Sequence, residues 1–319
     1  MHVNASLGIS VFPQSGTTVS NLLKNADIAM YLSKQSKTPY VFFDNSMAEN
    51  INKRLTIENE LRNVILRNEL IVFYQPQFSL STGKLIGMEA LVRWQHPEKG
   101  LIPPSDFIDL SEETGQIYMI GEWVLKTACL TLKKWIDRGA CPIRVAVNLS
   151  NLQLEDEEII NKISTTIDAT QLPHELLELE ITESAVMNNE QLVIDKLEIL
   201  KDLGIKLAID DFGTGYSSLS YLKRLPINLL KIDRSFVNNS LSNKADEDII
   251  KTIIVLAHSM GVEVIAEGVE TKEQSTLLEE LHCDYVQGYY FGKPMPAEEF
   301  EKLLFPKANN NVYPISLLQ

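Results

Sequence analysis

From about residue 70 onward, the chain alternates between short apolar runs and longer segments whose apolar residues recur at helical spacing. The runs have the length of buried β-strands, and the longer segments have the 3.6-residue periodicity of amphipathic helices. Eight strands interleaved with helices predict an α/β fold, a (β/α)8 TIM-like barrel. The predicted strands span residues 71–78, 85–94, 144–148, 177–181, 206–210, 229–232, 262–266 and 285–287. The predicted helices span residues 104–114, 120–138, 155–169, 191–203, 217–222, 245–260 and 272–281.

Residues 1–45 predict a short N-terminal α+β fragment, with a strand at 7–13, a helix at 19–33 and a strand at 40–44. Three elements of this length cannot enclose a hydrophobic core, so the fragment is expected to belong to a larger domain. Residues 46–68 show apolar positions at helical spacing and predict a linker helix. The main domain is expected over residues 55–305, followed by a tail at 306–319.

The composition restricts the class of protein. The formal net charge of -14 over 319 residues argues against binding to DNA or RNA polymers, which requires a basic face. The three cysteines lack metal-ligand spacing, which favours a reduced, cytoplasmic location. No apolar run has membrane-spanning length, so a soluble chain is expected, although upstream segments of a longer parent protein could anchor it to a membrane.

Asp210 and Asp211 form the central motif of the sequence. They follow an apolar strand directly and precede a loop bracketed by Gly213 and Gly215. Buried ionised carboxylates require cations or several hydrogen-bond donors, so the pair predicts a site for one or two divalent metals. The alternative is a solvated turn, because Asp and Gly are ordinary turn residues.

Polar side chains recur at the same end of seven predicted strands. Any one of them could be a capped strand end or a solvated charge. Together they indicate an active site, because active sites of (β/α)8 barrels lie at the carboxyl ends of the strands. These residues are Glu89, Asn148, Glu180, Asp210, Lys231, Glu267 and Gln287.

The ligand types at this rim favour hard cations. Oxygen donors without histidine or cysteine suit Mg²⁺ or Mn²⁺ better than zinc. The five histidines show no paired spacing and are interpreted as structural or surface residues. A carboxylate cluster of this size can hold two metals, an arrangement suited to displacement at phosphorus. Lys231 would stay charged beside the acids, where it could stabilise the transition state or orient the attacking water.

The same residues resemble those of the EAL-domain phosphodiesterases, a family named after the motif found here as Glu89-Ala90-Leu91. The resemblance covers roughly residues 55–305 and runs through an ordered series of motifs. These are Tyr74-Gln75-Pro76, Asn148-Leu149-Ser150, Glu180-Ile181-Thr182-Glu183, residues 210–216, Lys231-Ile232-Asp233, residues 266–270 and Gln287-Gly288-Tyr289.

The N-terminal fragment resembles the C-terminal end of a GGDEF domain, the diguanylate cyclase type. The resemblance rests on Leu7-Gly8-Ile9-Ser10 and Ala26-Asp27-Ile28-Ala29-Met30-Tyr31. The signature loop of that family is absent from this sequence, so the fragment is expected to be an inactive remnant.

The EAL resemblance implies metal-dependent hydrolysis of cyclic di-GMP to linear pGpG, with Mg²⁺ or Mn²⁺, two per site, as cofactor. It also implies a homodimer, and the GGDEF remnant implies upstream sensor or GGDEF segments in a longer parent protein. The alternatives are a catalytically silent cyclic di-GMP sensor or protein-interaction module and, less strongly, an enzyme for other phosphodiesters.

The resemblance also assigns individual roles. Lys231, Glu267 and Glu89 would be catalytic, and Gln287 would help to position the attacking water. Glu183 and Glu270 would brace the loop at 212–219, which would also carry dimer contacts. The implied metal ligands are Glu89, Asn148, Glu180, Asp210, Asp211 and Glu267, and the implied substrate ligands are Gln75, Arg93, Gln287 and Asp233.

Overall fold

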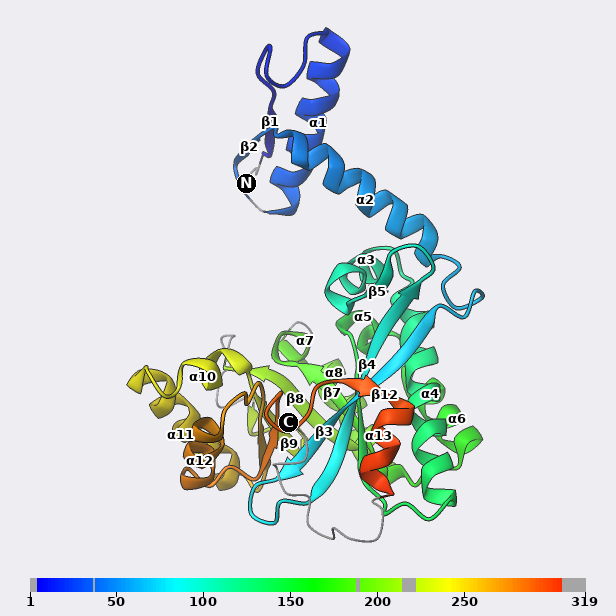
Figure 1. Ribbon diagram of the computed structural model, residues 1–319, viewed down its shortest axis with the longest axis vertical. Coiled ribbons are helices and arrows are strands. Elements are labelled where there is room, and N and C mark those ends of the chain that lie inside the picture. The colour runs from blue at the N-terminus through cyan, green and yellow to red at the C-terminus, as the bar shows by residue number, and fades with distance from the viewer. Residues whose placement is uncertain (1–4, 37, 188–189, 214–221, 306–319) are drawn as a thin grey trace.

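The computed structural model describes residues 5–36, 38–187, 190–213 and 222–305. Its N-terminal unit consists of β1 (Leu7–Ile9), α1 (Val19–Gln35) and β2 (Tyr40–Phe42), and β1 pairs in parallel with β2. The three predicted elements are present, but β1 ends at Ile9 and not at residue 13, and β2 ends at Phe42 and not at residue 44. The unit stands apart from the main body (Figure 1) and leaves apolar side chains such as Leu7 and Phe42 exposed.

Helix α2 (Asn45–Leu61) connects this unit to the main body. The prediction carried the helix to residue 68, but turns follow Leu61, and Asn68 adopts a φ of 54° that a helix cannot continue. The end of α2 is anchored to the main body, because Leu61 is buried in its core and Lys99 Nζ lies 2.6 Å from Glu60 Oε2.

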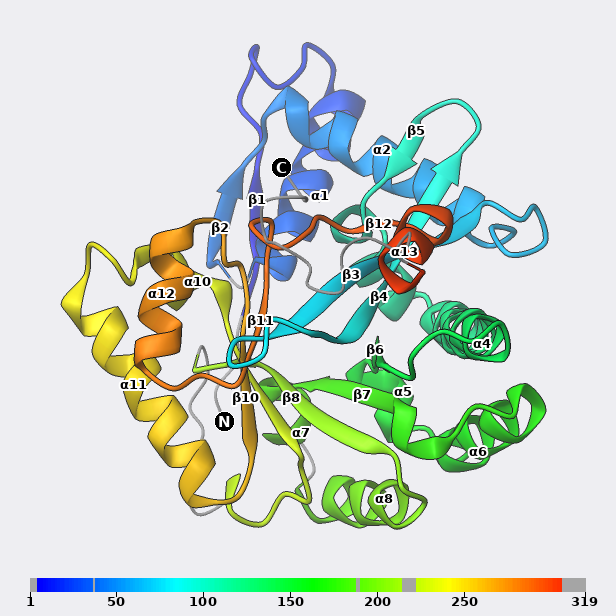
Figure 2. The ribbon, with the colours of Figure 1, turned by 60° about the horizontal axis from the view of Figure 1, so that its bottom comes forward.

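The main body is a closed eight-stranded barrel surrounded by helices (Figure 2), which confirms the predicted fold class. Around the barrel the order is β3-β4-β6-β7-β8-β9-β10-β11, and β11 pairs with β3 to close it. Two short strands, β5 (Gly100–Ile102) and β12 (Met295–Pro296), pair with β4 and β3. The barrel strands are β3 (Leu70–Ser79), β4 (Leu85–His96), β6 (Arg144–Asn148), β7 (Leu177–Thr182), β8 (Lys206–Phe212), β9 (Leu229–Ile232), β10 (Glu263–Ala266) and β11 (Tyr285–Gln287).

One strand departs from the regular barrel pattern. β3 runs antiparallel to both of its barrel neighbours, β4 and β11. Only residues 80–84 connect β3 to β4. A parallel connection needs a crossover of a dozen or more residues, so this short turn allows only an antiparallel pair. The remaining neighbours from β4 to β11 pair in parallel, and their carboxyl ends lie at one rim.

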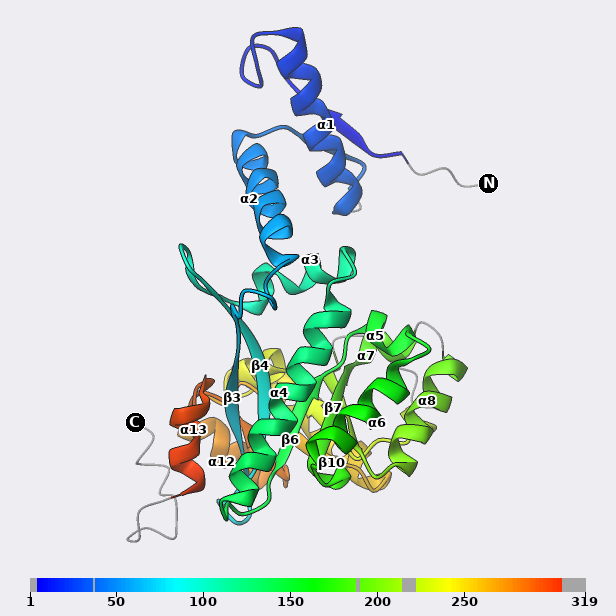
Figure 3. The ribbon, with the colours of Figure 1, turned by 90° about the vertical axis from the view of Figure 1, so that its right-hand side faces the viewer.

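Helices cover the outside of the barrel, as Figure 3 shows for α4, α6 and α8. The predicted helix at 104–114 is divided into a 3-10 turn and α3, and the one predicted at 155–169 begins later, at Ile159. The predicted helix at 217–222 lies almost wholly outside the described residues, as does the predicted tail. The remaining helical elements are η1 (Pro104–Asp106), α3 (Ile108–Glu113), α4 (Ile117–Asp137), α5 (Asn151–Glu155), α6 (Ile159–Thr170), η2 (His174–Leu176), α7 (Glu183–Met187), α8 (Glu190–Asp202), α10 (Arg234–Asn239), α11 (Lys244–Ser259), α12 (Lys272–Glu280) and α13 (Ala297–Leu304).

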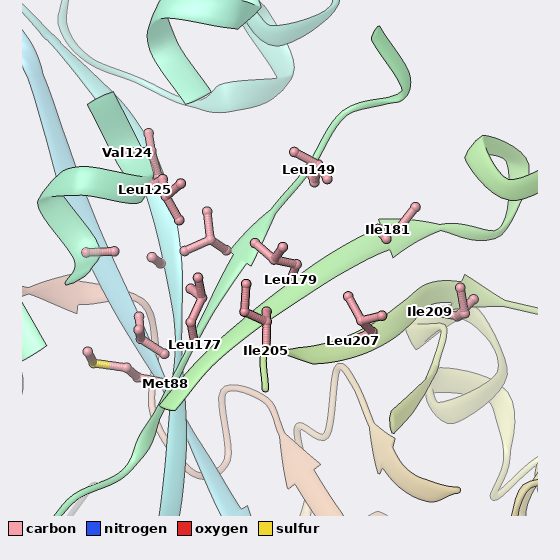
Figure 4. Packing of buried hydrophobic residues seen from close by; sticks show 14 of the residues in the cluster. Met88, Val124, Leu125, Leu149, Leu177, Leu179, Ile181, Ile205, Leu207 and Ile209 are labelled. Carbon is pink, nitrogen blue, oxygen red and sulfur yellow. The ribbon is translucent and has the colours of Figure 1, made fainter. Parts of the chain in front are cut away.

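Strand β7 shows how the sequence separates the core from the barrel interior. Leu177, Leu179 and Ile181 pack in the hydrophobic layer beneath the helices (Figure 4). Glu178 and Glu180 alternate with them, so they point to the opposite face of the strand, into the barrel. The apolar set stabilises the fold, and the alternate set supplies buried charge to the interior.

Within the described ranges, no helix combines the length and the apolar character that crossing a membrane requires.

Candidate active site

Lys231 lies at the centre of a buried carboxylate cluster. It projects from β9 with only 1% of its surface exposed. Its Nζ lies 2.7 Å from Glu180 Oε2, 2.7 Å from Glu267 Oε1 and 3.1 Å from Asp210 Oδ1. Glu89 Oε2 is 4.0 Å away. Four strands therefore deliver four carboxylates to one ammonium group, as the rim pattern predicts.

Two carboxamides orient Glu89 from either side. Asn148 Nδ2 donates to Glu89 Oε1 at 2.8 Å, and Gln287 Nε2 donates to Glu89 Oε2 at 2.5 Å. Gln287 Oε1 in turn accepts a hydrogen bond of 2.9 Å from Gln77 Nε2. Gln77 was not among the predicted site residues, although its spacing of two from Gln75 on one strand indicates the same inward face.

The cluster moves the pKa values of its members apart. Burial opposes the charge on Lys231, but the surrounding carboxylates, led by Asp210 and Glu180, hold its pKa well above the ordinary value. Burial raises the pKa of Glu180 well above its usual range, and the neighbouring Glu89 carboxylate adds to this shift. Burial also raises the pKa of Glu267 to about 8. For Glu89, burial is outweighed by Lys231 and the two carboxamides, so its pKa is lowered.

A second group of acids lies beside this cluster. One carboxylate oxygen from each of Asp210, Asp211 and Glu267 lies within 4.8 Å of the others. Burial and the adjacent Asp210 raise the pKa of Asp211 to about 6. Asp233 is held at the start of α10, where its Oδ1 accepts from Ser235 N at 3.0 Å. The oxygen-only donors and their spacing fit a hard divalent cation.

The carboxylates open onto a pocket of about 580 Å³. The implied substrate ligands Gln75, Arg93, Gln287 and Asp233 all line it. Arg93 is half-buried, with its Cζ 5.6 Å from the centroid of the Phe73 ring, so its guanidinium is partly oriented before any ligand binds. The full lining is Gln75, Glu89, Leu91, Arg93, Asp210, Asp211, Asp233, Arg234, Asn238, Glu267, Gly268, Glu270, Gln287, Gly288, Tyr289 and Pro294.

Gln75 is already engaged within the protein. Its Nε2 donates to the Gly292 carbonyl at 3.1 Å, and its Oε1 accepts from Gln287 Nε2 at 3.1 Å. It therefore orders the pocket wall as well as lining it. Arg234 and Tyr289 also line the pocket and were not predicted as site residues; the one signal for Arg234 is its place directly after Asp233.

The two predicted loop-bracing residues occupy different places. Glu183, at the start of α7, accepts a 2.9 Å hydrogen bond from N of Gly213, the last described residue at the start of the predicted loop. Glu270 lines the pocket, and its backbone N donates to Gln274 Oε1 at 2.7 Å. Residues 214–219 of that loop lie outside the described part of the chain.

Comparison with known proteins places this site in a family. The family model described as EAL domain matches residues 58–294. A bifunctional diguanylate cyclase/cyclic di-GMP phosphodiesterase of Pseudomonas aeruginosa, MucR, is 42% identical over 300 residues, covering 94% of this chain and 44% of MucR. The cyclic di-GMP phosphodiesterase NbdA of the same organism is 40% identical, covering 95% of this chain and 39% of NbdA. The chain thus spans less than half the length of these two relatives.

Solved structures give the same result. The phosphodiesterase domain of MucR in complex with c-di-GMP superposes with a TM-score of 0.75 at 42% identity, covering 77% of this chain and 99% of that structure. The EAL domain of FimX from Pseudomonas aeruginosa, also bound to c-di-GMP, superposes with a TM-score of 0.68 at 25% identity, covering 76% of this chain and 96% of that structure. This chain belongs to the EAL domain family.

Proposed function

We propose that this chain hydrolyses cyclic di-GMP to linear pGpG in a metal-dependent reaction. The observation that carries the proposal is the contact of Lys231 Nζ with three carboxylates at the base of a pocket that also presents Arg93. The names of MucR and NbdA as cyclic di-GMP phosphodiesterases support the same substrate.

The donor set fits one or two Mg²⁺ or Mn²⁺ ions. Asp210, Asp211 and Glu267 would hold one ion, and Glu89, Asn148 and Glu180 complete the proposed ligand set. Such ions, when bound, lower the pKa of water and offset negative charge on phosphate oxygens.

The residues of the chain supply the remaining chemistry. Water attacks phosphorus and the bond to the 3′ oxygen breaks. That oxygen takes up a proton and becomes a hydroxyl, which opens the ring and leaves a 5′ phosphate. Glu267, once it has lost the proton that its raised pKa of about 8 holds near neutral pH, accepts the proton of the attacking water. Lys231 keeps its charge throughout and stabilises the phosphorane oxygens. Arg93 and Asp233 orient the substrate, with the guanidinium fork of Arg93 directed at phosphate.

The alternative is a sensor that binds cyclic di-GMP without cleaving it. Two observations favour the enzyme: every predicted metal ligand belongs to one connected set, and the contact between Glu183 and Gly213 is formed. An enzyme for other phosphodiesters shares this chemistry, and only the shape of the pocket separates the two.

We also propose a setting for the domain. The exposed apolar residues of the N-terminal unit support a GGDEF remnant that continues into upstream segments. We propose that the chain forms a homodimer, in part through the loop that Glu183 would brace. We also propose that it acts in the cytoplasm.

Hydrolysis of cyclic di-GMP with Mg²⁺ or Mn²⁺, measured as pGpG against an EDTA control, tests the function. Glu267→Gln should remove activity, whereas Glu263→Gln, at the other end of β10, should keep it. Tight binding without product in the unmodified chain would establish the sensor instead. Activity that is unchanged in EDTA would refute the metal-dependent mechanism.

A further inference from the structure

Arg234 is a cationic side chain of the pocket for which the proposed reaction has no role so far. It is exposed and lines the pocket together with Asp211, Asp233 and Glu267. In the described part of the chain, no hydrogen bond or ion pair engages its guanidinium. The lining contains more acidic than cationic residues, yet among the described residues no hydrogen bond or ion pair joins any of these acids to the guanidinium of Arg234. The guanidinium is therefore available to a ligand.

The stem of Arg234 is held in place although its end is exposed. The turn before it is fixed by Asp233, whose carboxylate accepts from Ser235 N. Gly268, at a φ of 70°, approaches so closely that a Cβ on it would lie 2.5 Å from Arg234 Cβ. The base of the side chain therefore packs against the backbone immediately after Glu267.

Arg234 and Arg93 lie on opposite sides of the barrel mouth. Arg93 is on β4, and Arg234 follows β9, which is four pairings away from β4 in either direction around the closed barrel. Figure 2 shows α10 and β4 on opposite sides of the barrel. The three clustered acids, Asp210, Asp211 and Glu267, lie on the same side of the mouth as Arg234. Glu267 directly precedes Gly268, against which the stem of Arg234 packs.

A cyclic dinucleotide carries two phosphates, and one arginine cannot reach both sides of the mouth. We propose that Arg234 is a substrate-binding residue, which donates hydrogen bonds to the phosphate lying on the side of Asp211 and Glu267, while Arg93 engages the other phosphate. The inference rests on the proposed function and adds a second phosphate contact to it. Arginine suits this role because its planar fork matches two phosphate oxygens.

The test compares Arg234→Gln and Arg234→Lys with Arg62→Gln, which changes an exposed arginine directly after α2 whose partner is Glu58. Calorimetry in EDTA measures the affinity for cyclic di-GMP without turnover, and KM and kcat are measured with Mg²⁺. Arg234→Gln should weaken binding about tenfold. Arg234→Lys should weaken it about threefold, because the ammonium keeps the charge but loses the fork. Arg62→Gln should leave binding unchanged.

Salt dependence separates a charge contact from a structural effect. The affinity of the unmodified chain should fall more steeply with added salt than that of Arg234→Gln, because a partly exposed ion contact is screened. Unchanged affinity in Arg234→Gln, or a loss that is equal at low and high salt, would overturn the proposal. If the unmodified chain binds and cleaves while the variants behave normally, only this inference fails. If it neither binds nor cleaves, the proposed function fails as well.

Discussion

Lys231 Nζ and Glu180 Oε2 lie 2.7 Å apart, in residues that are each only 1% exposed. A pair buried this deeply contributes less to stability than its Coulomb energy suggests, because removing both charges from water is costly. The pair lies near the rim formed by the carboxyl ends of the parallel strands, where active sites of this fold are found, and this position indicates a functional use. Lys231 holds a permanent positive charge beside the acids that would bind metal.

Replacing Lys231 with alanine tests this relationship. Turnover should fall by about 100-fold or more, because the charge that stabilises the phosphorane is lost. Removing one partner of a buried pair should also cost about 3 to 5 kcal/mol of unfolding free energy. Kinetics and urea unfolding measure the two effects, and binding in EDTA should change little. A loss confined to affinity would instead assign Lys231 to substrate binding.

Glu89→Ala should abolish hydrolysis and preserve binding of cyclic di-GMP. Glu89 accepts from Asn148 and Gln287, so its loss removes a proposed metal ligand and frees both carboxamides. Glu98→Ala, in the exposed turn that follows the same strand, is the matched control and should keep full turnover. Full turnover in Glu89→Ala would contradict the assignment.

Glu183→Ala should weaken the response to metal without unfolding the barrel. The carboxylate accepts from Gly213 N, so its removal frees the backbone two residues after Asp211. We expect the Mg²⁺ concentration for half-maximal activity to rise about tenfold, with an unchanged circular dichroism spectrum, since one charged hydrogen bond is worth roughly 1.5 to 3 kcal/mol. Glu270→Ala should act in the same direction. An unchanged metal response would remove the bracing role.

Gly288→Ala should damage the site through sterics alone. A Cβ at this position would lie 2.1 Å from Val269 O and 2.2 Å from Val269 N, and backbone atoms cannot move aside cheaply. Because Gln287 precedes it and hydrogen-bonds Glu89, the displacement should lower kcat as well as melting temperature. Gly83→Ala, where a Cβ would meet no atom although the φ of 64° strains an L residue, measures the cost of a glycine substitution that brings no clash. Equal effects of the two substitutions would refute the steric explanation.

Metal binding should release protons at neutral pH. Burial raises the pKa of Glu267 to about 8, so at pH 7 this carboxyl holds a proton in the metal-free protein and must lose it to become a ligand. The pKa of Asp211 is raised to about 6, so metal affinity should fall further as the pH drops below that value. Calorimetry in buffers of different ionisation enthalpy counts the protons. Binding without proton release at pH 7 would show that Glu267 is not a ligand.

The fold class and most of the pocket follow from the pattern of apolar and polar residues along the chain. Strand alternation on β7 separates Leu177 and Leu179 from Glu178 and Glu180, so that one face of the strand is apolar and the other is charged. The residues placed at the strand ends by this pattern are those that surround Lys231.

Which of these residues touch, and which other residues join them, depends on how the chain closes in three dimensions. The antiparallel course of β3 follows from the short connection after Ser79, and it brings Gln77 beside Gln287, 210 positions away in the chain. Arg234 enters the pocket because Gly268 lets its stem pack against the backbone. Periodicity reports the face on which a side chain lies, whereas contact between distant strands depends on closure of the barrel, and no local pattern encodes that closure.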